Sequence, residues 1–235
     1  RMGPQTKSEY WRQVWRRGVI SSDYTDKQAS VLRVRNGKSI DEQLWEQTLA
    51  ALFRDIRISK EDRLLDFCCG NGLIALPASK ICKAVHAVDI NEELVASIAT
   101  ENCSIIDTQV ADAMDVEFGE AVFDKIVIYA AIQYFDDAEI AKLLQNFYRW
   151  LRPGGTVFIG DIPDRERLWT YFYNEEGERR YFDGVASGQP LIGNWIDQQW
   201  LSKLASYCGF GHSQYQAQDA RLIYADFRYD FILTK

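Results

Sequence analysis

Two short apolar runs, each accompanied by an acidic residue at its end, are the clearest pattern in this chain. The first run, Leu64–Phe67, contains Asp66 and leads into a turn of small residues, and the second, Ala84–Val88, ends at Asp89. A strand of a parallel sheet is apolar throughout because helices cover both of its faces. Ligands of such sheets bind beyond the carboxyl ends of the strands. The two runs therefore predict two buried strands that bring their carboxylates to one ligand-binding edge.

From residue 63 onward, strand-like and helix-like periods alternate. The pattern predicts strands at 63–67, 84–89, 105–110, 123–129 and 156–160, and helices at 72–81, 91–101, 136–150 and 196–207. Such alternation produces a parallel sheet with right-handed crossovers. Two further strands near 212–219 and 222–234 are close enough to form a hairpin, so we expect one of them to run antiparallel to the rest.

The predicted fold is therefore α/β, a doubly wound, seven-stranded, mostly parallel sheet with an antiparallel C-terminal hairpin strand. Ahead of it we expect a short helix at 8–18, with Ser8 as its N-cap and Gly18 as its stop, and an amphipathic helix at 41–57. We divide the chain into an N-terminal helical lid, 1–60, and a ligand-binding domain, 61–235. The segment 164–194 has no clean period and is predicted to be an irregular cap.

Composition limits the function classes. The chain has 235 residues, 47% of them hydrophobic, and a net charge of −7, which argues against a nucleic-acid backbone as its partner. No stretch has the character of a membrane span or a signal peptide, so we expect a cytoplasmic protein that binds no membrane. The five cysteines are odd in number, which favours reduced thiols over a disulfide framework. We expect no metal site, because the adjacent Cys68-Cys69 has no partner pair at ligand spacing.

The string Leu65–Gly72 resembles motif I of the class I S-adenosylmethionine-dependent methyltransferases, whose pattern is Asp-x-Gly-x-Gly-x-Gly. Asp89 with Ile90 matches the acidic end of the second strand in that family, and Asp112 with Ala113 matches the polar position after the third strand. Together these matches imply that S-adenosylmethionine is the cofactor and S-adenosylhomocysteine the product.

Two further stretches resemble the same family. Residues 123–135 are similar to the fourth-strand motif of its small-molecule members, and 151–155 to the turn before the fifth strand. Five motifs stand in the family's order over roughly residues 60–161. Cys68 is one departure, because the family has glycine at that position. A thiol fits a turn, but the backbone there must keep a negative φ or accept strain.

The resemblance implies a role for each matched residue. Asp89 accepts hydrogen bonds from the ribose hydroxyls, Asp66 faces the methionine amino group, and Asp112 accepts from the adenine amine. Each acid also has a purely structural interpretation, as a helix cap, a loop-ordering acceptor or a solvated loop acid. The complete set of expected cofactor-binding residues is Asp66, Cys68, Gly70, Asn71, Gly72, Asp89, Ile90, Asp112, Ala113, Tyr129 and Ala130.

Methyl transfer requires the acceptor to be aligned with the reactive methyl group, and a general base where the acceptor loses a proton. Asp161, after the fifth strand, is the first candidate for this base, and Gln133 and Tyr134 are expected to contact the acceptor. His212 is a weaker candidate for the base, and His86 is interpreted as structural.

The acceptor is predicted to be a small molecule methylated on oxygen or nitrogen. The Asn-Pro-Pro-Tyr motif typical of methylation of planar amino nitrogens is absent, and Ala130–Gln133 stands near that position. The cap carries Arg165, Arg167, Arg179 and Arg180, which suit an anionic acceptor. Acidic neighbours in the cap also favour simple surface ion pairs. The oligomeric state is left open.

Aromatic residues of the first helix, Tyr10, Trp11 and Trp15, suit either a lid over the cofactor or a helix packed on the domain. Two other functions stay open at this point. One is a non-catalytic S-adenosylmethionine-binding or scaffold protein on the same fold. The other is a nicotinamide-dependent oxidoreductase, because Gly70–Ala75 also fits Gly-x-Gly-x-x-Ala.

Overall fold

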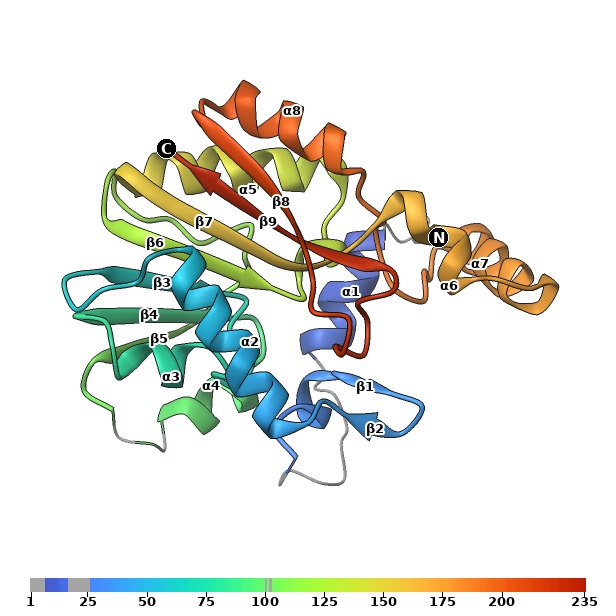
Figure 1. Ribbon diagram of the computed structural model, residues 1–235, viewed down its shortest axis with the longest axis horizontal. Coiled ribbons are helices and arrows are strands. Elements are labelled where there is room, and N and C mark those ends of the chain that lie inside the picture. Colours follow the sequence, from blue (N-terminus) through green and yellow to red (C-terminus); the bar gives the residue numbers. More distant parts are fainter. Residues whose placement is uncertain (1–6, 17–25, 100, 102) are drawn as a thin grey trace, which may run out of the picture.

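The computed structural model describes residues 7–16, 26–99, 101 and 103–235, and a seven-stranded sheet forms its centre (Figure 1). The strand order is β5-β4-β3-β6-β7-β9-β8. The strands are β3 (Arg63–Phe67), β4 (Ala84–Asp89), β5 (Ile106–Val110), β6 (Phe123–Tyr129), β7 (Leu151–Pro163), β8 (His212–Ala217) and β9 (Arg228–Thr234). β9 runs antiparallel to both β7 and β8, and the pairs from β5 to β7 are parallel. The expected fold class is confirmed.

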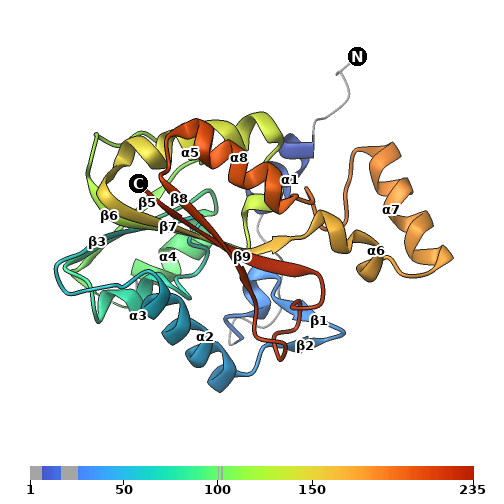
Figure 2. The ribbon, with the colours of Figure 1, turned by 45° about the horizontal axis from the view of Figure 1, so that its top comes forward.

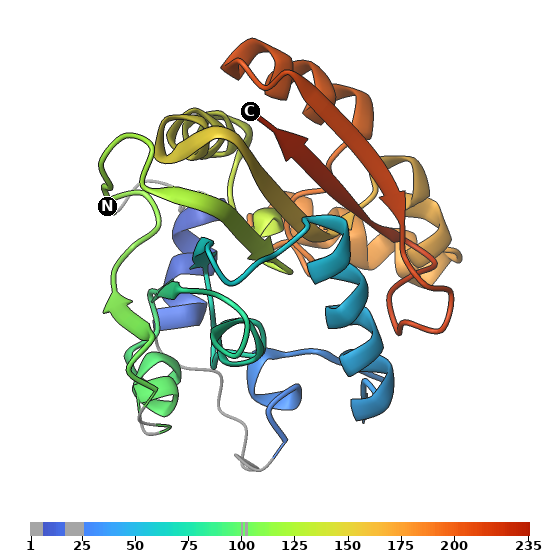
Figure 3. The same cartoon turned by 60° about the vertical axis from the view of Figure 1, so that its left-hand side comes forward.

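Helices cover both faces of this sheet (Figures 1 and 3). One layer contains α2 (Glu42–Asp55), α3 (Ala75–Ser79) and α4 (Glu92–Ala99), and the other contains α5 (Asp137–Trp150) and α8 (Gln198–Cys208). Alternate strand residues supply the two cores. Phe67, Ile126 and Ile128 pack with α5 and α8, whereas Leu64 and Val127 pack with the other layer. This double covering explains why the central strands are apolar throughout.

Side-chain caps fix where the longer helices begin. The Asp41 carboxylate accepts from the Leu44 backbone N–H at 3.0 Å at the start of α2. Asp136 and Glu139 form a reciprocal capping box at the start of α5. Because α5 follows the end of β6, this cap also fixes the path of the chain beside the strand ends, where the ligand-binding edge was expected.

The elements match their expected positions with a few shifts at their ends. β7 begins at Leu151 rather than at residue 156. Phe123 of β6 pairs with Leu151 and Lys125 pairs with Thr156, so the register between the two strands shifts at this point. The helix expected at 72–81 is only Ala75–Ser79, since the turn after β3 uses the residues before it. The first helix, α1, is Lys7–Arg16, and the expected stop at Gly18 lies outside the described residues.

The segment 164–194 is not irregular, and this corrects the sequence analysis. It contains η3 (Arg165–Arg167), α6 (Leu168–Tyr171) and the thirteen-residue α7 (Glu175–Ser187), which project away from the sheet in Figure 2. Asn174 caps α7, and Gly188 ends it in the left-handed region. Gly177 and Gly184 interrupt the apolar pattern of a helix that is mostly exposed, so its period is hidden in the sequence.

The N-terminal residues make two different kinds of contact. α2 belongs to the helical layer beneath the sheet, whereas α1 packs against η2 (Ile132–Tyr134), which directly follows β6. Between them lie η1 (Ala29–Val31) and the short hairpin β1 (Val34–Arg35) with β2 (Lys38–Ser39), which the sequence pattern did not predict. The division at residue 60 stays a prediction. In the part of the chain that the structure describes, no helix has the length and apolarity to cross a membrane.

Candidate active site

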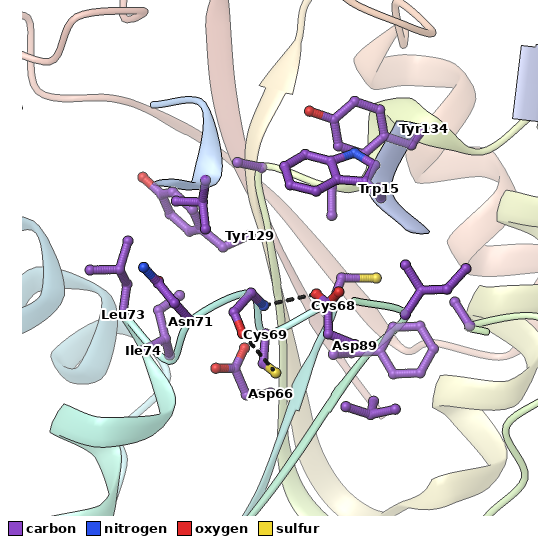
Figure 4. A pocket seen from close by; sticks show the side chains of 18 of the residues that line it. Trp15, Asp66, Cys68, Cys69, Asn71, Leu73, Ile74, Asp89, Tyr129 and Tyr134 are labelled. Carbon is purple, nitrogen blue, oxygen red and sulfur yellow. Dashed lines mark hydrogen bonds between the residues drawn. The ribbon is translucent and has the colours of Figure 1, made fainter. Parts of the chain in front are cut away.

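A cavity of about 1010 Å³, measured with its open mouth, lies at the carboxyl ends of the central strands and beneath α1 (Figure 4). Ten of the eleven expected cofactor-binding residues line it, namely Asp66, Cys68, Gly70, Asn71, Asp89, Ile90, Asp112, Ala113, Tyr129 and Ala130. Gly72 does not line it. The parallel register explains this convergence, because neighbouring parallel strands end at the same edge of the sheet.

Asp89 ends β4 with both of its carboxylate oxygens engaged. Oδ2 accepts from the Gly70 backbone N–H at 2.8 Å, and Oδ1 accepts from the Asn91 N–H at 2.9 Å. Burial raises the pKa of this carboxyl, and the backbone N–H groups partly offset the rise. Asp89 therefore joins the turn after β3 to the start of α4, so its structural role and the expected ribose-binding role share one side chain.

Asp66 lies one strand away and is 2% exposed. Its Oδ2 accepts from the Ala75 N–H at 2.9 Å, at the first residue of α3. Burial raises its pKa to about 7, despite that hydrogen bond, and the nearby Asp89 raises it further. A buried carboxyl group with so few hydrogen-bond partners is stabilised in its charged form by a cationic ligand group in the cavity.

Cys68 occupies the glycine position of the turn with φ +61°. The structure thus settles the alternative left by the sequence, since the backbone accepts the strained left-handed conformation. Burial raises the pKa of the thiol well above its usual value, with the neighbouring acids adding to the rise, so the side chain is a neutral thiol.

We expect Cys68→Gly to stabilise the protein by about 0.5–1 kcal/mol. Glycine removes a left-handed strain of about 1–2 kcal/mol and costs up to about 1 kcal/mol of extra chain entropy. Thermal unfolding measures the change, as a rise of roughly 1–4 °C. Cys208→Gly is the control, because at the end of α8 glycine only lowers helix stability. Equal losses of thermal stability in both variants would show that the backbone at Cys68 is not strained.

The two glycines of the turn serve different neighbours. Gly70 has φ +53°, and a Cβ there would lie 3.0 Å from the Val31 side chain. Gly72 has φ +83°, and its Cβ would lie 2.9 Å from Ile98 of α4. Gly70 is therefore needed for the approach of the segment before β1, and Gly72 for packing of the helical layer rather than for contact with the cavity.

Asp112 lines the cavity two residues after the end of β5 and contacts α1. Its Oδ1 accepts from the Met114 N–H at 3.0 Å, and its Oδ2 lies 3.1 Å from Arg12 Nε and 3.1 Å from Arg16 Nη2. Arg12 also pairs with Glu139 of the α5 capping box. α1 is thus fixed by charge to the residue expected to bind adenine.

The aromatic side chains of α1 form the wall that faces the strand ends. The ring centroids of Trp11 and Trp15 lie 4.6 and 5.4 Å from that of Tyr134, and both tryptophans line the cavity. Asn91 Nδ2 donates to the Trp15 carbonyl at 2.7 Å and holds the C-terminal part of the helix. The two interpretations of this helix coincide, since it packs on the domain by the same side chains that cover the cavity.

The structure brings one of the three expected catalytic residues into the lining. Tyr134 lines the cavity, and burial raises its pKa to about 12. Gln133 is buried behind it, and its amide donates to the Ala130 carbonyl at 2.9 Å. Asp161 is 1% exposed, has φ +60°, and pairs with Arg228 at 2.9 Å. Gln133 and Asp161 do not line the cavity in the part of the chain described, and their catalytic roles stay predictions.

The two histidines and the cap lie outside the lining of the cavity. His86 bonds to Gln109 at 2.9 Å and to Asp107 at 3.2 Å on β5, consistent with its structural interpretation, and His212 is an exposed residue that begins β8. None of the described cavity-lining residues comes from 164–194. Arg167 is engaged with Asp164 at 3.0 Å. The cap is joined to the sheet by a separate apolar cluster, Leu168, Phe172, Trp195 and Phe227.

Sequence reasoning missed several lining residues, and Arg33 and Trp45 are the two that carry a charge and a large aromatic ring into the part of the wall near Tyr129. Arg33 is 5% exposed, and its guanidinium carbon lies 4.7 Å from the centre of the Trp45 ring and 4.8 Å from that of Tyr129. Trp45 had been counted only as an apolar position of α2. No periodic signal marks 26–40, so the sequence offered no means of placing Arg33 here.

The cavity fits the cofactor that the resemblance implies. Six buried polar atoms of lining residues have no hydrogen-bond partner among the described residues: Trp11 Nε1, Trp15 Nε1, Arg33 Nε, Arg33 Nη1, Asn71 Oδ1 and Tyr129 Oη. Buried polar groups are nearly always paired, so these atoms indicate a polar ligand. Carboxylates from the ends of β3 and β4, with aromatic walls above, suit a nucleoside that carries a positive charge.

Comparisons with known proteins agree with this arrangement. A family model described as a methyltransferase domain matches residues 64–155. The chain is 28% identical over 167 residues to phosphoethanolamine N-methyltransferase of Plasmodium falciparum, covering 69% of this chain and 62% of that protein. It is 28% identical to demethylmenaquinone methyltransferase of Staphylococcus carnosus, covering 79% of this chain and 74% of that protein.

A solved structure of Haemonchus contortus phosphoethanolamine N-methyltransferase 1, in complex with phosphoethanolamine and S-adenosylhomocysteine, has the same fold. Its TM-score is 0.72 at 14% identity, and the match covers 99% of this chain and 50% of that one. The chain thus spans about half to three quarters of these three relatives.

Proposed function

Since the chain carries a class I S-adenosylmethionine-dependent methyltransferase domain, we propose that it methylates a small-molecule acceptor on oxygen or nitrogen by in-line displacement. The observation that carries the proposal is the single cavity that joins the acids of β3 and β4 to the aromatic wall of α1. A relative named phosphoethanolamine N-methyltransferase supports a nitrogen acceptor, and one named ubiquinone biosynthesis O-methyltransferase supports an oxygen acceptor.

The protein's part in this reaction is to bind the cofactor, to align the acceptor with the methyl group and to exclude water. S-adenosylmethionine, when bound, supplies a methyl group on a positively charged sulfur. Asp89 and Asp112 hold the nucleoside end, and Asp66 faces the amino group. Trp11 and Trp15 cover the cavity and keep water from competing with the acceptor.

The acceptor side is formed by the end of β6 and by η2, which follows it. Tyr134 contacts the acceptor directly, and its phenol donates a hydrogen bond because its raised pKa keeps it protonated. Gln133 supports the backbone of Ala130. Asp161, fixed by Arg228, receives the acceptor proton only if that ion pair opens. We therefore favour acceptors that need no strong base, namely neutral amines and acidic hydroxyl groups.

Methyl transfer from radiolabelled S-adenosylmethionine to panels of small amines, phenols and other hydroxyl compounds tests the proposal. We expect acceptor-dependent release of S-adenosylhomocysteine with the wild type. Tyr134→Phe should lower turnover about tenfold, since it removes one hydrogen bond and keeps the ring that packs on Trp11 and Trp15. Cofactor binding without methylation of any small molecule would favour the non-catalytic alternative, and binding of NADH instead would favour the oxidoreductase.

A further inference from the structure

Arg33 carries a buried positive charge that has no ion-pair partner among the described residues. Its Nε and Nη1 atoms are both buried and make no hydrogen bond within the described chain. Arg228 is the instructive comparison, because it is buried to the same degree, 6% exposed against 5%, but pairs with Asp161 at 2.9 Å. Arg228 keeps one unpartnered buried nitrogen, Nε, but has an ion-pair partner, whereas Arg33, which lines the cavity, has two unpartnered nitrogens and no ion pair among the described residues.

Such an arrangement is costly unless a ligand completes it. A buried charge without a partner costs several kcal/mol, and the two aromatic faces of Trp45 and Tyr129 offset about 2 kcal/mol each at best. Aromatic rings also lack the lone-pair acceptor that the N–H groups of a guanidinium need. The N–H groups at its edge need an acceptor, and a planar oxyanion is the acceptor whose geometry matches them.

The fold holds Arg33 firmly in this place. Leu32 adopts φ +60°, and the Arg33 N–H donates to the Gln28 carbonyl at 2.9 Å, which closes the turn before it. Asn71, from the turn after β3, donates to the Lys27 carbonyl at 2.8 Å and to Ser30 Oγ at 2.7 Å.

A second anchor follows immediately in the chain. Tyr224 Oη donates to the Val34 carbonyl at 2.7 Å. The backbone on both sides of Arg33 is thus tied to the domain, which means that the guanidinium is positioned before a ligand arrives.

We propose that Arg33 is an oxyanion-binding residue of the cavity, which binds the carboxylate of a ligand through Nε and Nη1 while the rings of Trp45 and Tyr129 pack beside the guanidinium. The unpartnered Tyr129 hydroxyl lies on the same side of the cavity and offers a further donor. The proposal rests on the methyltransferase function, and two sources can supply the carboxylate. One is the methionine portion of the cofactor, and the other is an acidic group of the acceptor.

Calorimetric titration of Arg33→Met separates these sources. The probes are S-adenosylhomocysteine, which has the amino-acid carboxylate, and 5′-methylthioadenosine, which lacks it. Arg35→Met is the matched control, because Arg35 is two residues away and pairs with Asp226 at 2.7 Å outside the cavity. We expect Arg33→Met to fold with at least wild-type thermal stability, since it removes an unpaired buried charge and keeps an unbranched side chain.

If the cofactor is the source, Arg33→Met binds S-adenosylhomocysteine about 10- to 100-fold more weakly and binds 5′-methylthioadenosine about as the wild type does. If the acceptor is the source, both affinities stay unchanged. Acetate added to the S-adenosylhomocysteine complex then shifts the Arg33 Nε–H resonance, which is assigned by its absence from the variant. Either result supports the proposal.

Equal weakening of both nucleosides, or unchanged affinities together with no effect of acetate, would overturn the proposal and leave Arg33 as a packing residue. These failures differ from failure of the methyltransferase function itself. In that case the wild-type protein binds neither nucleoside, whatever residue stands at position 33.

Discussion

Replacing Asp89 with alanine is expected to weaken binding of S-adenosylhomocysteine by at least about 100-fold. The carboxylate is the acceptor available to the ribose hydroxyls at the end of β4, and each hydrogen bond to a charged group contributes about 1.5–3 kcal/mol. Two such bonds correspond to more than a factor of 100 in affinity. Calorimetric titration with S-adenosylhomocysteine measures the loss directly.

The same carboxylate also accepts from Gly70 and Asn91, so a structural effect must be separated from the binding effect. Asp89→Asn keeps a carbonyl oxygen for one of these two backbone donors, so it disturbs the fold less than alanine does and should still lose most of the affinity. Asp115→Ala, an exposed acid in the loop after β5, is the control and should bind as the wild type does. Unchanged affinity in a folded Asp89→Ala protein would show that Asp89 only caps the start of α4.

Asp66→Asn is expected to make the ligand-free protein more stable at pH 8 and less dependent on pH between about 4 and 7. The folded-state pKa of about 7 lies above the unfolded value of 3.8, so the folded protein binds more protons in this interval. Its free energy of unfolding therefore falls as the pH rises from about 4 through 7 and levels off above that. Three pKa units correspond to about 4 kcal/mol as an upper limit.

Asparagine removes this penalty because it resembles the neutral acid and its carbonyl still accepts from Ala75. Thermal unfolding at pH 5 and pH 8 measures the effect, and the variant should gain roughly 5 °C or more at pH 8. Asp107→Asn is the control, since that carboxylate is exposed. A variant with the wild-type dependence on pH would contradict the raised pKa.

The same substitution should harm binding if Asp66 meets the cofactor's amino group. Wild-type affinity for S-adenosylhomocysteine is expected to rise as the pH increases through 7, because the carboxylate forms. In Asp66→Asn this rise should be lost. Stability and binding would then change in opposite directions, as is common for buried functional charges.

The arrangement of α1 explains how a helix from the start of the chain takes part in a site built on strands. Arg12 and Arg16 pair with Asp112, and Arg12 also reaches Glu139 of α5. These ion pairs are only partly exposed, so they are screened less by salt than surface pairs are. They hold the tryptophans over the cavity in the absence of any ligand.

The sequence by itself determined the sheet and the edge at which the site forms. Strands buried on both faces are apolar throughout, and a carboxylate at the end of such a run must lie at the edge of the sheet. This local rule placed Asp66 and Asp89 in one cavity before any contact was known, and the family resemblance added Asp112. The bounds of β3, β4 and β6 agree with the expected strands for the same reason.

Only the tertiary structure decided which polar groups are satisfied, because that depends on contacts between residues far apart in the chain. The sequence indicated a free acid at Asp161, after a strand expected to end at 160, but Asp161 lies within β7 and Arg228, 67 positions away, neutralises it. Gly72 looked like a cofactor glycine, but it makes room for Ile98. Arg33 had no pattern around it, yet its burial between Trp45 and Tyr129 makes it the open charge of the cavity.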